Sequence, residues 1–246
     1  MEFTYYGDLL GVSSFYRLSP EIAYKRINDF YEMTFKTLSQ FLEERKESIS
    51  VVMFSDSILM WGDDAMGAMI EIHKLYNELL TKGLYLRGAM VSGKLLTDPR
   101  FELRHYKNSL LPSNDTLARA VGLEKTQKGA RFLIENKLVQ KILPENYSDW
   151  LLNEGYIQNP QKDSSTIHDP LRRIAPTPDC IAYEFLYFWS CPPASERKPT
   201  DYSLMRKQLE SASKMTSRVF AEHYEETLEL IKRCEERQNF TLEQVK

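Results

Sequence analysis

Residues 49–61 read ISVVMFSDSILMW. Two apolar runs with strand-forming residues, 49–54 and 57–61, are separated only by Ser55 and Asp56. Strand-type runs that are joined by two residues with turn chemistry predict a β-hairpin. We therefore expect Asp56 to lie at the tip of a tight hairpin.

The sequence before this hairpin predicts a strand, a loop and a helix. Residues 3–7 are rich in aromatic residues and predict a strand that ends at Asp8, and residues 9–19 read as a loop. Ser19-Pro20-Glu21 predicts a helix start, with a capping hydroxyl, proline at the first helical position and an acid in the first turn. Apolar residues at helical spacing extend this helix to about Arg45.

After the hairpin, the pattern predicts a helix over 65–81 and a strand over 84–91. The order β-α-β-β-α-β is that of the split βαβ, or ferredoxin-like, unit that polymerase palm domains also use. Because the βαβ crossover makes the first two strands parallel, the end of the first and the turn after the second lie at one sheet edge. We therefore expect Asp8 and Asp56 to face each other.

The remaining sequence adds strands and helices to this unit. We expect an α/β (α+β) domain with a four- or five-stranded mixed sheet over residues 1–195, and a helical extension over 196–246 that covers the domain or pairs with a second subunit. The expected elements are a helix over 115–127, a strand over 130–135, an exposed connection over 159–179, a strand over 180–189 and one long or two short helices over 201–237.

The overall composition excludes several classes of function. The 246 residues include 32 basic and 35 acidic side chains, a net charge of −3, which disfavours nucleic acid as a partner. Cys180, Cys191 and Cys234 lack the spacing of a disulfide framework or a zinc site. No signal-peptide pattern and no apolar run of about 18 residues is found, so we expect a cytoplasmic protein without a membrane segment.

Two carboxylates at strand ends on one sheet edge suit two-metal phosphoryl transfer. In that chemistry bridging oxygens hold two divalent cations about 3.5–4 Å apart. The alternative is that Asp8 and Asp56 are solvated turn residues, because aspartate is common in turns.

Four stretches favour the metal-binding alternative because they resemble class III adenylyl and guanylyl cyclases, in the right order, over about residues 3–135. Residues 6–13, YGDLLGVS, resemble the first metal motif, and residues 54–57, FSDS, resemble the second, in which glycine normally precedes the aspartate. Residues 86–93, LRGAMVSG, resemble the strand that follows. Residues 117–124, LARAVGLE, resemble the helix of the catalytic asparagine and arginine.

This resemblance implies that Asp8 and Asp56 bind two divalent cations, Mg²⁺ or Mn²⁺, and that the Leu9 carbonyl is a further ligand. The backbone amides that would face the triphosphate are those of Gly11, Val12 and Ser13. Consecutive N–H groups before a helix form an anion-binding cradle. The resemblance also implies a symmetric homodimer whose active sites lie between the subunits.

The sequence departs from the family at the catalytic helix. The family's asparagine and arginine align with Ala118 and Gly122, and neither residue can stabilise charge on a phosphate. Arg119 is the leading substitute, and Arg87 is a second candidate that would contact the nucleotide. An inactive cyclase-homology module that senses nucleotides or mediates dimerisation is therefore an alternative function.

The position that reads the base has changed as well. Val52 stands four residues before the second metal aspartate, where purine cyclases place a lysine or glutamate, and the second base contact falls near 111–112. Loss of hydrogen-bonding partners implies a base other than a purine. Tyr31 or Phe30 on the first helix is our candidate for a bulky residue that narrows the base pocket, although helical spacing also suits both as core residues.

This combination resembles the pyrimidine cyclases of bacterial Pycsar antiphage systems. Such enzymes convert UTP or CTP to cyclic UMP or cyclic CMP, which acts on a separate cyclic-nucleotide-sensing effector. An adenylyl cyclase with unusual base recognition is the other alternative. His73, His105, His168 and His223 lack metal-ligand spacing, and we expect each to be structural or exposed.

Overall fold

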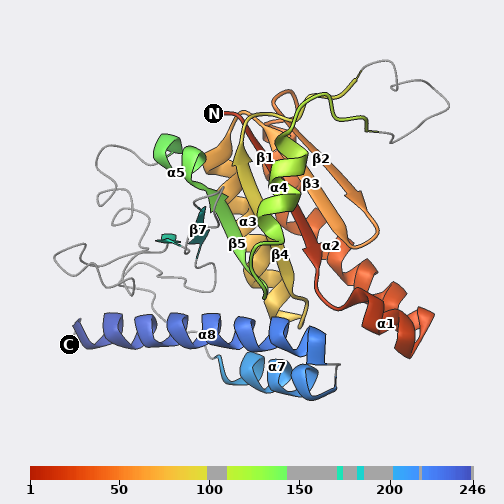
Figure 1. Ribbon diagram of the computed structural model, residues 1–246, viewed down its shortest axis with the longest axis vertical. Coiled ribbons are helices and arrows are strands. Elements are labelled where there is room, and N and C mark those ends of the chain that lie inside the picture. The colour runs from red at the N-terminus through yellow and green to blue at the C-terminus, as the bar shows by residue number, and fades with distance from the viewer. Residues whose placement is uncertain (99–109, 143–170, 174–181, 186–201, 216–217, 245–246) are drawn as a thin grey trace.

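A computed structural model describes residues 1–98, 110–142, 171–173, 182–185, 202–215 and 218–244. A twisted mixed sheet forms the centre, with α2 and α3 against one face and α4 against the other (Figure 1). The predicted α/β fold class is confirmed. Histidines 105 and 168, cysteines 180 and 191 and most of the connection expected over 159–179 lie outside the described residues.

The described sheet has seven strands in the order β2-β3-β1-β4-β5-β7-β6, two more than the expected maximum of five. The strands are β1 Phe3–Leu9, β2 Ile49–Phe54, β3 Ser57–Gly62, β4 Leu86–Ser92, β5 Phe132–Glu135, β6 Leu171–Arg173 and β7 Ala182–Phe185. β1 pairs antiparallel with both β3 and β4, and β4 pairs parallel with β5. Since β2 is antiparallel to β3, β1 and β2 run in the same direction, as the βαβ crossover predicted.

The described helices include all those that the sequence predicted and two that it did not. They are α1 Val12–Leu18, α2 Pro20–Glu44, α3 Ala65–Thr81, α4 Thr116–Glu124, α5 Asn136–Ile142, α7 Ser203–Met215 and α8 Arg218–Gln244. The expectation of a loop over 9–19 was wrong at α1. This helix has seven residues, buries only Val12 and has no side-chain cap at its N-terminus, so neither periodicity nor capping chemistry reveals it.

Local capping chemistry sets the ends of the two long helices near the hairpin. The Ser19 hydroxyl accepts a hydrogen bond from the Ile22 amide at 3.1 Å at the start of α2, as the sequence predicted. Asp64 accepts one from the Gly67 amide at 3.0 Å at the start of α3. Gly83, with φ of 65°, lies just beyond the end of α3.

Alternation along β1 divides the core between two faces of the sheet. Phe3 and Tyr5 are fully buried in the main hydrophobic cluster under α2 and α3. Tyr6 lies on the opposite face, where α4 packs over the second cluster of Ala89, Val91, Ala120, Leu123 and Leu133. Because side chains alternate along a strand, Asp8 shares the face of Tyr6.

The C-terminal helices α7 and α8 form an antiparallel pair that covers one end of the sheet of the same chain (Figure 1). Tyr202, Leu209, Leu230 and Ile231 are buried in the main cluster. The Ala130 amide, two residues before β5, donates to the Thr227 hydroxyl at 2.9 Å. Of the two expected roles for the extension, covering the domain is therefore the one observed. None of the helices described is both long and apolar enough to cross a membrane.

Candidate functional site

The end of β1 and the β2–β3 turn meet at one edge of the sheet. The Leu9 amide donates to the Asp56 carbonyl at 2.9 Å, and Asp8 pairs across the strands with Ser57. Asp8 and Asp56 line one pocket of about 190 Å³. The structure thus brings together the two carboxylates that lie 48 positions apart in the sequence.

The turn that carries Asp56 adopts a conformation that favours glycine. Ser55 has φ of 52° and is the only non-glycine residue with positive φ in the described part of the chain. A positive φ at the first of the two turn residues is typical of hairpins that use glycine there. The serine, which stands where the family normally has glycine, is therefore accommodated at some cost in conformational energy.

We expect Ser55→Gly to stabilise the protein by about 0.5–1 kcal/mol, because glycine relieves the left-handed strain while adding some unfolded-state entropy. Urea unfolding would measure the change in midpoint. Ser50→Gly, at an exposed position in β2, is the matched control and should destabilise by a similar amount. A lower midpoint for Ser55→Gly than for the parent protein would contradict the prediction.

The β1–α1 connection lines the same pocket through Gly11, Val12 and Ser13. Gly11 has φ of 81° and starts α1, with its carbonyl accepting from the Ser14 amide at 2.9 Å. The positive φ favours glycine, and a Cβ at Gly11 would lie 2.5 Å from the Tyr224 hydroxyl, so any other residue would have to displace that hydroxyl. The predicted anion cradle and the two aspartates thus lie in one pocket.

The third wall of this pocket comes from α8, through Phe220, His223 and Tyr224. Sequence reasoning did not place these residues at the site, although their spacing of three and four puts them on one helix face. The sequence does not indicate that these residues share a pocket with Asp8, because more than 200 positions separate them from it.

His223 is half-buried, and its Nδ1 accepts a hydrogen bond from the Gly129 amide at 3.1 Å. Burial, with the charges of Arg87 and Lys128, lowers the pKa of His223, so the ring is neutral at pH 7. Because the backbone N–H can only donate, the neutral ring carries its proton on Nε2. His223 is thus structural as expected, and it also lines the pocket.

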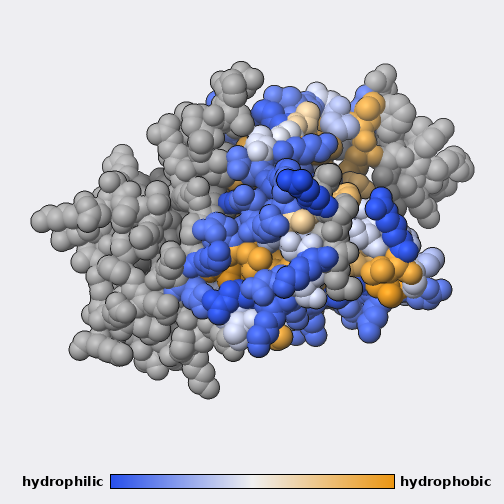
Figure 2. Space-filling view, turned by 60° about the horizontal axis from the view of Figure 1, so that its bottom comes forward, coloured by the Kyte–Doolittle hydropathy of each residue, from blue (hydrophilic) through white to orange (hydrophobic). Residues whose placement is uncertain are grey.

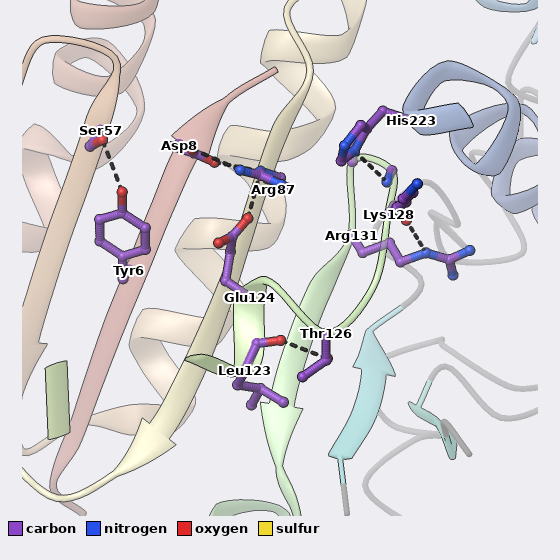
Figure 3. Close-up of polar contacts among 12 residues, drawn as sticks. Tyr6, Asp8, Ser57, Arg87, Leu123, Glu124, Thr126, Lys128, Arg131 and His223 are labelled. Atoms are coloured by element: carbon purple, nitrogen blue, oxygen red, sulfur yellow. Dashed lines mark hydrogen bonds and ion pairs between the residues drawn. The ribbon is translucent and has the colours of Figure 1, made fainter. Parts of the chain in front are cut away.

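Arg87 on β4 lies directly against Asp8 (Figure 3). Its Nε and Nη2 contact the two carboxylate oxygens at 2.7 and 3.2 Å, and its Nε also lies 2.5 Å from an oxygen of Glu124. One guanidinium therefore bridges two carboxylates. The structure places this predicted nucleotide contact in the pocket with both aspartates.

Glu124, the last residue of α4, was not singled out by sequence reasoning. Its side chain is fully buried, and its oxygens have no hydrogen bond with groups in the described residues beyond the ionic contact to Arg87. Burial, and then the negative charge of Asp8, raises the pKa of Glu124 to about 7, although Arg87 opposes the shift. The Glu124 carboxyl, next to the candidate metal ligand Asp8, therefore gains and loses its proton near neutral pH.

The raised pKa of Glu124 predicts a pH-dependent stability. Between pH 4.5, the ordinary value, and about 7, the folded state binds more protons at this group than the unfolded state does, so stability falls as the pH rises. Ionisation above this window costs roughly 3 kcal/mol. Glu124→Gln removes this cost. The free energy of unfolding in urea should therefore be the same for Glu124→Gln and the parent near pH 4.5, and higher for the variant by roughly 3 kcal/mol at pH 8.

The exposed Glu47 supplies the matched control, and Glu47→Gln should follow the parent protein at both pH values. A constant difference between Glu124→Gln and the parent across the pH range would show that Glu124 titrates normally.

Arg119, the leading catalytic candidate, lies at the other end of the sheet. Its guanidinium contacts Glu135 at 2.5 Å, the Ser92 carbonyl at 2.7 Å and Asp115 at 3.2 Å. Ser92 and Arg87 stand five residues apart on β4, or roughly 16 Å. Within one chain Arg119 is therefore remote from Asp8, and a role at the aspartates requires a second copy of the chain.

The candidate base contacts do not come together in one chain. Phe30 is fully buried in the core, in line with the core alternative for this residue. Tyr31 lines a cavity of about 1,020 Å³ with Val51 and Met53, and burial, followed by the charge of Asp56, raises its pKa. Val52 alternates to the other face of β2, the face that Tyr6 and α4 share.

The donors at the pocket suit Mg²⁺ or Mn²⁺, which prefer carboxylate and carbonyl oxygens. Asp8 and Asp56 supply the carboxylates, and Leu9 also lines the pocket. No group of three or more acidic, histidine or cysteine side chains among the described residues could hold a metal. The two carboxylates would therefore share cations with backbone, phosphate and water oxygens. Arg87 contacts both carboxylate oxygens of Asp8 and would have to release at least one of them to a cation.

Comparison with known proteins identifies the fold. No model of a protein family matches the chain, and no curated protein matches it. The guanylyl cyclase domain of the RhoGC fusion protein from the aquatic fungus Blastocladiella emersonii aligns with a TM-score of 0.52 and 11% identity over 75% of this chain and 95% of that one. Adenylate cyclase from Trypanosoma brucei aligns with a TM-score of 0.50 and 10% identity over 76% and 90%. The chain thus has the fold of class III nucleotidyl cyclases.

Proposed function

We propose that this chain is a nucleotidyl cyclase, a phosphorus–oxygen lyase that converts UTP or CTP to the 3′,5′-cyclic monophosphate and pyrophosphate. One observation carries the proposal: Asp8 on β1 and Asp56 in the β2–β3 turn line one pocket together with residues 11–13. The cyclase fold supports it.

In the proposed reaction the ribose 3′-oxygen attacks the α-phosphorus, the bond to the β-phosphate oxygen breaks, and the 3′-hydroxyl loses its proton. Asp8, Asp56 and the Leu9 carbonyl would hold two divalent cations, which when bound supply an activated 3′-hydroxyl and neutralise the triphosphate. The amides of residues 11–13 bind phosphate oxygens, and α8 walls the pocket. Positioning and charge stabilisation supply most of the catalysis.

The preference for a pyrimidine rests on the apolar character of β2. Val52 offers no hydrogen-bonding group, and Phe54 on the same face is 49% exposed. A purine edge would have no hydrogen-bonding partner there, which weakens the recognition of ATP and GTP. We therefore expect UTP as the preferred substrate, with CTP next.

The test is incubation of the full chain with each of the four nucleoside triphosphates and Mn²⁺, with the products resolved by chromatography. We expect cyclic UMP or cyclic CMP, with turnover of ATP and GTP lower by about 10–100-fold, the effect of one or two lost hydrogen bonds. Comparable turnover of ATP would instead indicate an adenylyl cyclase with unusual base recognition.

Absence of product from every triphosphate would indicate a different function. Two observations favour an inactive cyclase-homology module that senses nucleotides. Ala118 and Gly122 stand at the catalytic positions, and Arg87 forms a salt bridge with the candidate metal ligand Asp8. Equilibrium binding of the same four triphosphates would then identify the sensed nucleotide.

The proposed assembly is a symmetric homodimer in which Arg119 of one chain serves the aspartates of the other. The remote position of Arg119 within its own chain is compatible with that arrangement. The resemblance to Pycsar cyclases supports a cytoplasmic role in antiphage defence, in which the cyclic nucleotide acts on a separate effector.

A further inference from the structure

A second pocket, of about 600 Å³, lies between the N-terminal helices and α7. Its charged lining consists of Arg17 on α1, Arg26 on α2, Lys82 at the end of α3 and Lys207 on α7. No aspartate or glutamate among the described residues lines it. We call this the basic pocket. On the face seen in Figure 2, most side chains are hydrophilic and surround a smaller hydrophobic patch.

Among the described residues, no carboxylate neutralises the four cations of the basic pocket. None of them forms an ion pair with a carboxylate in the described part of the chain. By contrast, Arg45, Arg87, Arg119 and Arg131 each contact an acidic side chain. Four uncompensated positive charges in a chain of net charge −3 create a local field that attracts anions.

Contacts with other lining residues of the basic pocket hold Arg26 in position. Its Nη1 donates to the Lys82 carbonyl at 2.9 Å, and its guanidinium carbon lies 5.5 Å from the centre of the Phe15 ring. These contacts leave further N–H donors on the same guanidinium for a ligand, because arginine has five. A donor that is held in place by its own chain loses less entropy when it binds a phosphate oxygen.

The basic pocket adjoins the pocket of the two aspartates. Tyr224 lines both, and its ring packs edge-on against Tyr85 with centroids 5.8 Å apart. Ser13 lines one pocket and Ser14 the other. The two pockets are therefore neighbouring compartments on either side of α1 and Tyr224.

We propose that the basic pocket binds a polyphosphate group, either inorganic pyrophosphate or the polyphosphate of a nucleotide. Four cations match the three to four negative charges of such a group, and arginine and lysine are the side chains that bind phosphate oxygens most strongly. A volume of about 600 Å³ exceeds the needs of a single orthophosphate. This inference rests on charge and geometry and holds whether or not the chain is a cyclase.

The test is calorimetric titration of the full chain with inorganic pyrophosphate in the presence of EDTA, which excludes binding through a metal at the aspartates. Arg17→Glu/Lys207→Glu reverses two exposed charges of the pocket and should weaken binding at least about 10-fold. Lys36→Glu/Lys137→Glu makes the same change in net charge at exposed positions outside the pocket and should leave binding within about twofold of the parent. The proposal would be overturned if both double variants weakened pyrophosphate binding equally. It would also be overturned if the parent chain bound neither pyrophosphate nor UTP.

Two further arms separate the sources of the ligand and the two proposals. The first arm is titration with UTP under the same conditions. If Arg17→Glu/Lys207→Glu weakens UTP binding as much as it weakens pyrophosphate binding, the site belongs to a nucleotide. If UTP does not bind, the site belongs to free pyrophosphate. Asp56→Asn should bind pyrophosphate like the parent, because Asp56 lines only the other pocket. Pyrophosphate binding without any cyclic product would refute the cyclase alone, and product formation without such binding would refute the basic pocket alone.

Discussion

We expect Asp56→Asn to lower the rate of the proposed nucleotide cyclisation by about 10³-fold or more and to leave the fold intact. The amide keeps the size of the side chain but loses the charge that attracts a divalent cation. The Asp56 carboxylate forms no ion pair among the described residues, so its replacement breaks no salt bridge there. Product formation in Mn²⁺ measures the first effect, and the urea midpoint measures the second.

Asp8→Asn should lose activity to the same extent but is the less selective variant. It also removes the two-point contact with Arg87, whose stability effect is about 1–3 kcal/mol for a partly buried charge pair. The exposed Asp63→Asn, at the far end of β3, is the matched control and should retain full activity. An Asp56→Asn protein with more than about a tenth of parental activity would place the metal site elsewhere.

Removal of residues 202–246 should abolish cooperative folding. The truncation strips the main cluster of Tyr202, Leu209, Leu230 and Ile231, which are at most 2% exposed. At about 1.5–3 kcal/mol for each buried side chain, the loss approaches the whole stability of a typical domain. The expected observation is an insoluble chain, or one without a sigmoidal urea transition.

A single substitution tests the same packing more gently. Leu230→Ala should destabilise by about 3 kcal/mol through lost burial and a cavity, with Lys232→Ala on the exposed face of α8 as the matched control. If the truncated chain unfolded cooperatively with the midpoint of the full chain, α7 and α8 would be an independent appendage.

The sequence was sufficient where structure depends on local chemistry. The Ser19 cap and the Gly83 terminus gave the bounds of α2 and α3 to within a residue or two. The two-residue turn at Ser55 gave the hairpin, and the βαβ rule then brought Asp8 and Asp56 to one edge. These inferences need only capping, periodicity and the handedness of crossovers.

The sequence was insufficient where structure depends on distant contacts. Nothing in the periodicity of α8 indicates that His223 lies beside Asp8, and nothing in the motif 117–124 indicates that Glu124 is buried against Arg87. Tyr31 and Val52 lie on opposite faces of the sheet. Their placement follows from strand register and helix packing, which alignment to a motif does not give. Whether Arg87 or Arg119 would serve the proposed reaction depends on the proposed subunit arrangement, which alignment to a motif does not give either.

The position of α8 also bears on the order of events during synthesis. Strands β1 to β4 and helices α2 and α3 come from the first 92 residues, so both aspartates leave the ribosome well before the helices that complete the core. The wall made by residues 220–224 emerges only near the end of translation. A nascent chain would therefore carry the acidic pair for more than a hundred codons without an enclosed pocket, and premature termination would leave that pair open to solvent.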